Sequence, residues 1–242
     1  MTVHHKTAHY LDDLVLPINP GDCGQAEPTV ESLGDLGTVV SYLVQDEAAE
    51  EPGDRMDMGA FLAHYHRDCW IEREELPEDL LRLVYRDNQG MDLDEEERER
   101  VKALLAVYHV YPVAAHIHSG VMLYLGAWTG AASLDPGGWD TSHVGAIACS
   151  REEWPEEDKA EQYAQGMIDE YNAWSSGDVW GVVVVEYAAG DTEPREYDAC
   201  WGYYGHKYAE DERYGTHAAT VARIRKAAAD MAALTAGPCL AL

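Results

Sequence analysis

Residues 179–204, VWGVVVVEYAAGDTEPREYDACWGYY, contain the pattern that decides the fold class. Two runs of β-branched and aromatic residues, 179–187 and 195–204, lie on either side of a turn through Gly190 and Asp191. Residues of these types favour strands, and a short connection with glycine is typical of a hairpin. The stretch therefore predicts two antiparallel strands that pair with each other.

Further apolar runs have the length and the β-branched composition of strands. The first, GTVVSYLVQ at residues 37–45, is apolar enough for a buried strand. Residues that favour turns, above all Gly, Pro, Asp and Ser, separate the runs that follow. These later strands are predicted at residues 110–118, 121–128 and 144–149.

Helical spacing of apolar residues alternates with these strands. The clearest helix, DLDEEERERVKALLAVY at residues 92–108, has carboxylates in its first turn, where the helix dipole favours them. Strands interleaved with single helices predict an α+β fold with a mainly antiparallel sheet and flanking helices. The other helical segments are predicted at residues 58–75, 77–86, 154–174 and 214–234.

Composition along the chain predicts three parts. Residues 1–36 are rich in Pro, Gly and Asp and predict an irregular lead-in. Residues 37–212 are expected to form a single α+β domain, in which residues 46–108 are an acidic helical insertion after the first strand. Residues 213–242 are expected to form a basic C-terminal helix that packs on this domain.

The net charge is -28 at pH 7, from 45 acidic and 17 basic residues. Charge of this size lowers stability through self-repulsion, so either salt screens it or a cationic partner needs it. The acids are spread over loops and helix starts, which favours halophilic adaptation of a folded domain. No direct nucleic-acid binding is expected, because phosphates would be repelled, and the only candidate footprint is the basic segment 213–226.

Cysteine usage and hydropathy indicate the setting of the protein. Five widely spaced cysteines without a Cys-x-x-Cys pair predict neither a disulfide framework nor a zinc knuckle. No apolar stretch approaches the roughly 20 residues of a membrane-spanning helix. We therefore expect a soluble protein of a reducing cytoplasm, without membrane association. No cofactor is expected either, since no phosphate-cradling glycine motif occurs.

The candidate catalytic residues are His118, Asp140, Asp178 and Cys200. His118 with Asp140 or Asp178 supplies the groups of acid–base catalysis. Cys200 is a candidate nucleophile, although its thiolate would need an electropositive pocket. Ser119 completes the residue types of a hydrolytic triad, but it lacks the Gly-x-Ser-x-Gly setting and follows His118 directly, so the two side chains would point to opposite faces of a strand.

A histidine pair raises the possibility of a metal site. His116 and His118 are two residues apart in a predicted strand, which places both imidazoles on one face. With His143 they could bind a metal ion if the fold brings all three together. The alternative interpretation is that these histidines are polar residues at the rim of the core.

Five short motifs follow one another between residues 36 and 205. They are LGT at 36–38, HSG at 118–120, WD with VG at 139–145, GDVWG at 177–181 and CWGYYG at 200–205. In this order, and at predicted strand ends, they resemble an uncharacterised family of accessory proteins from tailed bacterial and archaeal viruses. The resemblance implies a viral accessory protein and no particular activity. His116 and His143 depart from the family pattern, which weakens the metal hypothesis.

Three functional hypotheses follow. The leading one is a virus-encoded accessory protein that binds a host or viral protein in the host cytoplasm, so that binding is expected rather than catalysis. The first alternative is an anti-defence protein, an acidic nucleic-acid mimic that inhibits a host defence or DNA-binding enzyme through the clusters at 46–57 and 92–99. The second is a small hydrolase or nucleotide-processing enzyme that uses His118 with Asp140 or Asp178. The sequence leaves open the oligomeric state and whether the protein is a minor component of the virion.

Overall fold

The computed structural model of this 242-residue chain divides into two compact units. The first, called the split unit, comprises Met1–Ala49 and Gly177–Leu242. The second, called the inserted unit, comprises Glu50–Ser176. The structure describes residues 9–20, 27–52, 60–64, 83–84, 86–87, 90–126 and 137–235.

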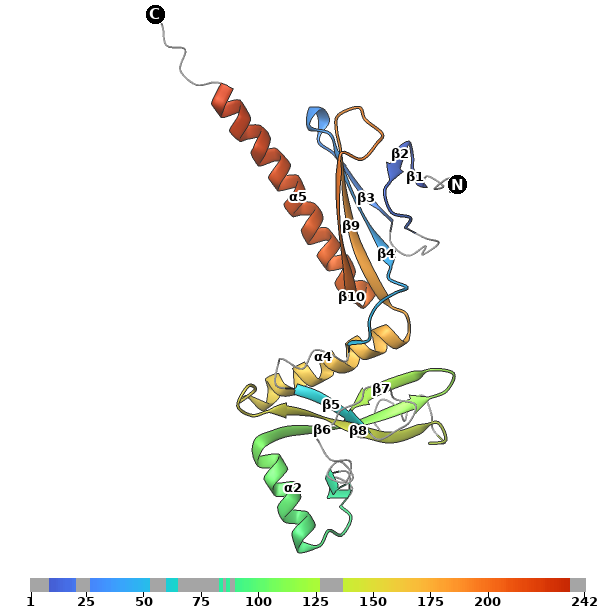
Figure 1. The fold of residues 1–242 in the computed structure, drawn as a ribbon, viewed down its shortest axis with the longest axis vertical. Coiled ribbons are helices and arrows are strands. Elements are labelled where there is room, and N and C mark those ends of the chain that lie inside the picture. The colour runs from blue at the N-terminus through green and yellow to red at the C-terminus, as the bar shows by residue number, and fades with distance from the viewer. Residues whose placement is uncertain are drawn as a thin grey trace, which may run out of the picture. The chain divides into compact units, whose positions relative to one another are not determined.

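The split unit is built on a four-stranded antiparallel sheet with the strand order β10-β9-β4-β3. Helix α5, His206–Thr235, covers one face of the sheet, and the hairpin of β1 and β2 covers the other (Figure 1). The strands of this unit are β1 (His9–Leu11), β2 (Leu14–Leu16), β3 (Thr29–Ser32), β4 (Thr38–Gln45), β9 (Val179–Tyr187) and β10 (Glu196–Tyr204), and a 3-10 turn, η1, spans Gly34–Leu36.

Burial on both faces explains why β4 and β9 are apolar at most positions rather than alternating. Val39 and Leu43 belong to the core cluster shared with α5. Val40 and Tyr42 point the other way and pack with Leu16 of β2. Successive side chains of a strand alternate between faces, so a strand covered on both sides is buried at nearly every position, and a polar residue there, such as Ser41, needs a hydrogen-bond partner.

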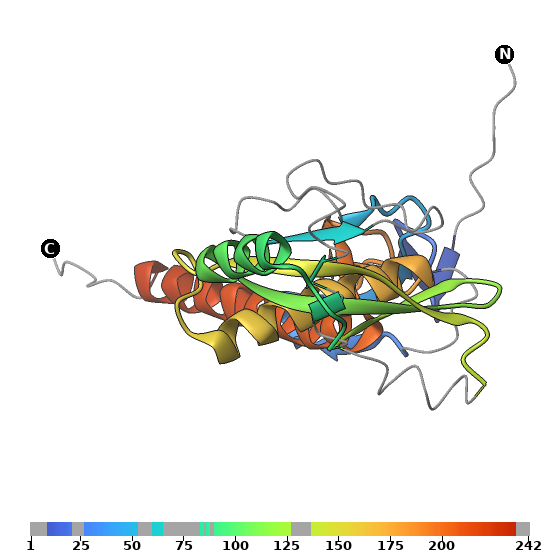
Figure 2. The same ribbon diagram turned by 90° about the horizontal axis from the view of Figure 1, so that it is seen from below.

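The inserted unit contains a second four-stranded antiparallel sheet, with the order β5-β8-β6-β7. Helices α2 and α4 lie on opposite faces of it (Figures 1 and 2). The larger core lies under α4, where Ile168 and Tyr171 pack on Ile147 and Leu123. The elements are β5 (Ala60–His64), α2 (Glu95–Val107), β6 (Tyr108–Ile117), β7 (Val121–Leu125), β8 (Thr141–Ser150) and α4 (Glu157–Ser175).

The acidic start of α2 forms a capping box. The Asp94 side chain accepts a hydrogen bond from the Glu97 backbone N–H at 2.8 Å, and the Glu97 side chain accepts one from the Asp94 backbone N–H at 2.9 Å. These bonds satisfy N–H groups that have no partner inside the helix. The bond from Asp94, followed by that from Arg86, holds the pKa of Glu97 below its usual range.

The inserted unit lies between β4 and β9 in the sequence, although these two strands pair directly in the split unit. Gln45 and Trp180 are register partners at the end of that pair. Just beyond it, the Asp46 N–H donates to the Val179 carbonyl at 2.8 Å, and the Gln45 side-chain amide donates to the Gly177 carbonyl at 2.9 Å. The two connections therefore leave side by side, an arrangement that allows a whole unit to be inserted without disturbing the sheet.

The α+β class and the mainly antiparallel pairing predicted from the sequence are confirmed, including the pairing of β9 with β10. The expected single domain at residues 37–212 instead divides, with the inserted unit at Glu50–Ser176 in place of a helical insertion at 46–108. Antiparallel strands that are far apart in sequence can pair directly, and composition does not reveal this. Within the described ranges, no helix is long and apolar enough to cross a membrane.

Three local expectations are corrected. The lead-in at 1–36 holds β1, β2 and β3, because these short strands gain partners in the tertiary structure. Residues 60–64, inside the helix predicted at 58–75, form β5, whose pairing with β8 overrides the helical spacing. The C-terminal helix begins at His206 rather than 214. The rest of 58–75 and most of 77–86 lie outside the described residues, although residues 83–84 and 86–87 are helical.

Side chains of α4 cover the outer edge of β7. The Asn172 carbonyl oxygen accepts from the Leu123 N–H at 2.7 Å, and the Asn172 amide donates to the Leu123 carbonyl at 2.9 Å. Ser175 donates to the Val121 carbonyl at 3.0 Å. Asn172 thus takes the place of a neighbouring strand residue, which removes an edge open to unwanted pairing.

Replacing Asn172 with Ala is expected to lower the free energy of unfolding by about 1–3 kcal/mol, because two partly buried backbone groups lose their partner. Urea denaturation measures the effect. Gln165→Ala is the matched control in the same helix, since it removes only an exposed bond to Asp169, and its effect should stay within about 0.5 kcal/mol. Equal effects of the two substitutions would contradict the edge-covering role.

Candidate functional site

His118 and Asp140 are the two predicted catalytic residues that the inserted unit brings together. His118 follows β6, Asp140 precedes β8, and these strands are antiparallel neighbours. The Ile117 N–H donates to the Asp140 carbonyl at 2.7 Å and fixes the two backbones. The His118 Nδ1 atom lies 2.8 Å from Asp140 Oδ2, with the two side chains 69% and 42% exposed.

The chemistry of this pair follows from its geometry. An ionised Asp140 can only accept, so the Nδ1 atom of His118 carries the proton in their hydrogen bond. In the neutral ring this leaves the Nε2 lone pair free to accept a proton from another molecule. The pair can therefore act as an oriented base, or as a polar anchor for a binding partner.

Ser119 does not complete a triad with His118. Its hydroxyl donates to the His118 carbonyl at 2.6 Å. Ser119 also has a positive φ of 58°, because it turns the chain between β6 and β7. Its role is to form the turn.

The three histidines of the metal hypothesis share one end of the sheet. The His116 and His118 rings are stacked with centroids 6.2 Å apart, and His143 pairs in register with Ala114, two residues before His116. Burial lowers the pKa of His143 to about 4, so this ring is neutral at pH 7. Among the residues that the structure describes, no three His, Cys, Asp or Glu side chains are placed to hold a metal ion.

Asp178 belongs to the split unit and has structural partners there. Its Oδ1 atom accepts from the Trp180 indole N–H at 2.5 Å and from the His206 backbone N–H at 3.0 Å. The second bond holds the first turn of α5, and the Trp180 and His206 rings meet edge-on at 5.1 Å. Asp178 thus anchors the start of α5 to β9.

Cys200 lies on β10 of the split unit with an exposed, free thiol. It forms a hydrogen bond with Tyr203, and this contact, followed by burial, raises the pKa of the Tyr203 hydroxyl to about 12. The following residue, Trp201, lies over Gly181 of β9, where a Cβ atom would come within 2.4 Å of the indole ring. Close packing therefore explains the second glycine of the GDVWG motif, Gly181, and the tryptophan of CWGYYG, Trp201.

Two exposed apolar residues lie near the His118–Asp140 pair, one along the chain and one in the strand register. Trp139, which directly precedes Asp140, is 90% exposed. Met122 is exposed on β7, is the register partner of His116, and accepts a hydrogen bond at its sulfur from the Tyr124 hydroxyl. We call these five residues, His116, His118, Met122, Trp139 and Asp140, the hairpin-end surface. The WD motif marked Trp139, but only the structure reveals its exposure.

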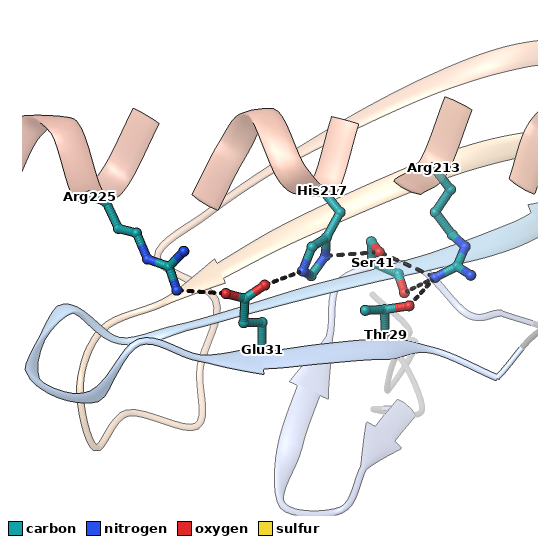
Figure 3. A network of polar contacts seen from close by, with 6 residues as sticks. All are labelled: Thr29, Glu31, Ser41, Arg213, His217 and Arg225. Atoms are coloured by element: carbon teal, nitrogen blue, oxygen red, sulfur yellow. Dashed lines mark hydrogen bonds and ion pairs between the residues drawn. The ribbon is translucent and has the colours of Figure 1, made fainter. Parts of the chain in front are cut away.

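A second constellation, which no sequence signal indicated, lies between α5 and its sheet (Figure 3). His217 Nδ1 is 3.0 Å from the Ser41 hydroxyl, and His217 Nε2 is 3.4 Å from Glu31 Oε2. These are the residue types of a Ser–His–Glu triad. Ser41, however, is 0% exposed, so a substrate has no access to its hydroxyl.

The role of this network is to seat α5 on the sheet. The buried Arg213 guanidinium donates to the Thr29 hydroxyl at 2.6 Å and to the Ser41 carbonyl at 3.3 Å, and it lies over the Tyr214 ring. At the exposed end, Arg225 pairs with Glu31 at 2.8 Å (Figure 3). Buried charged groups are costly without such partners, so the network specifies one position of the helix.

The acidic run of α2 bears on the nucleic-acid mimic. Three of its carboxylates have cationic partners in the same unit: Glu95 with Arg98, Glu97 with Arg86, and Glu99 with Lys102. A phosphate mimic needs carboxylates that are available to an enzyme's cations. These pairs reduce that availability along the helix.

No family model, no curated protein and no solved structure matches the chain. The resemblance to viral accessory proteins therefore rests on the five motifs and stays a prediction.

His143 is expected to make stability depend on pH. Its pKa is about 4 in the folded protein and about 6.5 when unfolded, so between these values only the unfolded chain takes up the proton. Above pH 6.5 the ring is neutral in both states and protonation costs no stability. As the pH falls from 6.5 toward 4, the free energy of unfolding is expected to decrease by about 3 kcal/mol. Denaturation of the wild type and His143→Gln from pH 7 to 4 should show the larger loss in the wild type; parallel curves would refute the assignment.

Proposed function

We propose that this chain is an accessory protein that acts by binding another protein through the hairpin-end surface. The observation that carries the proposal is Trp139, which is 90% exposed beside the His118–Asp140 pair. An exposed large aromatic side chain is unfavourable in water, and tryptophan is enriched among the residues that dominate binding energy. Its exposure is explained if a partner buries it.

The neighbours of Trp139 support binding rather than enclosure of a small substrate. Met122 adds a second exposed apolar side chain, and His118 and Asp140 add polar groups that are already oriented by their mutual hydrogen bond. An apolar anchor with fixed polar groups around it is typical of a protein interface. The motif resemblance supports the finer proposal of a viral protein whose partner is a host or viral protein in the host cytoplasm.

The test is to measure binding after the anchor is removed. Partners crosslinked to the tagged chain in its own host should be purified and titrated against the chain by calorimetry. Trp139→Ala is expected to weaken the affinity about 30-fold or more, because a central tryptophan typically contributes at least 2 kcal/mol. The fold should be unaffected, since the side chain is almost fully exposed.

Tyr197→Ala is the matched control, because Tyr197 is also an exposed aromatic residue and lies in the split unit. It should leave the affinity unchanged. If Trp139→Ala binds every titrated partner as tightly as the wild type, or if no crosslinked protein binds saturably, the proposal fails.

A second candidate function is a small hydrolase or nucleotide-processing enzyme, and the 2.8 Å His118–Asp140 contact favours it. In this case His118 would be the general base, and Asp140 would orient its ring. Asp178 is not needed, since its Oδ1 atom already accepts two hydrogen bonds within the split unit.

Turnover of p-nitrophenyl esters, p-nitrophenyl phosphates and nucleoside triphosphates tests the enzymatic alternative. His118→Ala should lower kcat/KM by about 10²–10⁴-fold, the usual contribution of a general base. Ser119→Ala should retain activity, because the Ser119 hydroxyl bonds only to the backbone in the described contacts. Absence of turnover in the wild type, or equal turnover in His118→Ala, would exclude the alternative.

A further inference from the structure

We propose that a cleft beside α2 binds a small zwitterion with an apolar body, that is, an apolar amino acid or dipeptide. The cleft lies in the inserted unit and has a volume of about 410 Å³. Small-molecule sites usually have volumes of about 300–1,000 Å³, so this one suits a ligand at the small end of the range. The residues that line it are Asp87, Arg98, Val101, Lys102, Leu105 and Ala106.

One face of α2 supplies five of the six lining residues. Residues three or four apart on a helix are neighbours on its surface, which brings Arg98, Lys102 and Leu105 together. Val101 is buried, whereas Leu105 is 37% exposed and Ala106 is exposed as well. An apolar surface with two cations beside it suits a molecule that combines an apolar part with a carboxylate.

The sixth lining residue, Asp87, precedes α2 and is held near it by its neighbour Arg86. The Arg86 guanidinium donates to Glu97 Oε1 and to the Asp92 carbonyl, each at 2.6 Å. The Gly90 N–H closes a turn by donating to the Asp87 carbonyl at 2.9 Å. These contacts fix the backbone of Asp87 relative to the start of α2, which lowers the cost of ordering the cleft around a ligand.

The charges of the lining select a zwitterion. Two cations would repel a cationic ligand, and an anion would be repelled by Asp87 and by the net charge of -28. A neutral apolar molecule would gain nothing from the charged groups. The carboxylate of a zwitterion can pair with Arg98 and Lys102, and its ammonium group can pair with Asp87. Its apolar body can then cover Leu105.

The two cations have exposed partners, which a ligand carboxylate must displace. Arg98 lies 3.6 Å from Glu95 and Lys102 lies 3.3 Å from Glu99, and all four side chains are at least 55% exposed. Exposed ion pairs contribute little to stability, so their exchange for a ligand costs little. Glu95→Gln with Glu99→Gln removes these competitors and should tighten ligand binding by about 2–5-fold.

NMR titration of the full ¹⁵N-labelled chain with leucine, phenylalanine and leucyl-leucine tests the proposal. We expect a Kd on the order of 0.1–5 mM, because these ligands have few atoms, and amide shifts concentrated at residues 98–106. N-acetylleucine lacks the ammonium group and leucinamide lacks the carboxylate. Each should bind at least about 10-fold more weakly than leucine, since one charged contact is lost.

Substitutions in the lining test the same assignment from the side of the protein. Arg98→Met with Lys102→Met should weaken leucine binding by about 10-fold or more, and so should Asp87→Asn. Asp87→Asn should not weaken the binding of N-acetylleucine, which has no ammonium group to lose. Arg100→Met is the matched control, because it removes a cation of α2 that does not line the cleft, and it should bind leucine like the wild type.

The substituted side chains are exposed, so all variants should keep the dispersed amide spectrum of the wild type. The proposal is overturned if none of the three ligands binds saturably up to about 50 mM. It is also overturned if Arg98→Met with Lys102→Met binds leucine as tightly as Arg100→Met, or if N-acetylleucine binds as tightly as leucine.

Discussion

The pairing of β4 with β9 is the constraint on which the split unit depends. Both strands are apolar on both faces, so they must lie at the centre of a three-layer arrangement, with α5 on one side and the β1–β2 hairpin on the other. The same pair keeps Gln45 beside Trp180 and so holds the two connections to the inserted unit next to each other. Hydrogen bonding between segments more than a hundred residues apart is what allows one chain to form two units.

Polar groups then specify positions that apolar packing leaves open. Apolar burial is not directional, so α5 could slide along its sheet without large loss. Arg213 and His217 oppose this, because the Arg213 Nη1 atom meets Thr29 and the His217 Nδ1 atom meets Ser41 at one position of the helix only. Asn172 acts in the same way in the inserted unit, where it satisfies one residue at the edge of β7. The residue types of a catalytic triad serve here as structural polar contacts, because Ser41 is fully buried.

The candidate catalytic residues differ in their exposure and in their hydrogen-bond partners. His118 and Asp140 are at an exposed end of their sheet, next to Trp139, whereas Asp178 is occupied by the first turn of α5. Exposure separates the two interpretations of the His118–Asp140 pair, since a base needs a substrate enclosed beside it and a binding surface needs an accessible anchor. In α5, Arg223, Arg225 and Lys226 are paired with carboxylates of the same chain.

The sequence by itself determined the types of most elements, because the periods of strands and helices are local properties. It predicted the antiparallel β9–β10 hairpin, the acidic start of α2 and, among the candidate residues, a plausible partnership of His118 with Asp140. Only the tertiary structure decided the division into two units and the strand β5. Only it placed His118 beside Asp140 and showed that Asp178 anchors the start of α5. The reason is physical: hydrogen-bond partners and burial are set by segments distant in sequence, and no local pattern records which distant segment will supply them.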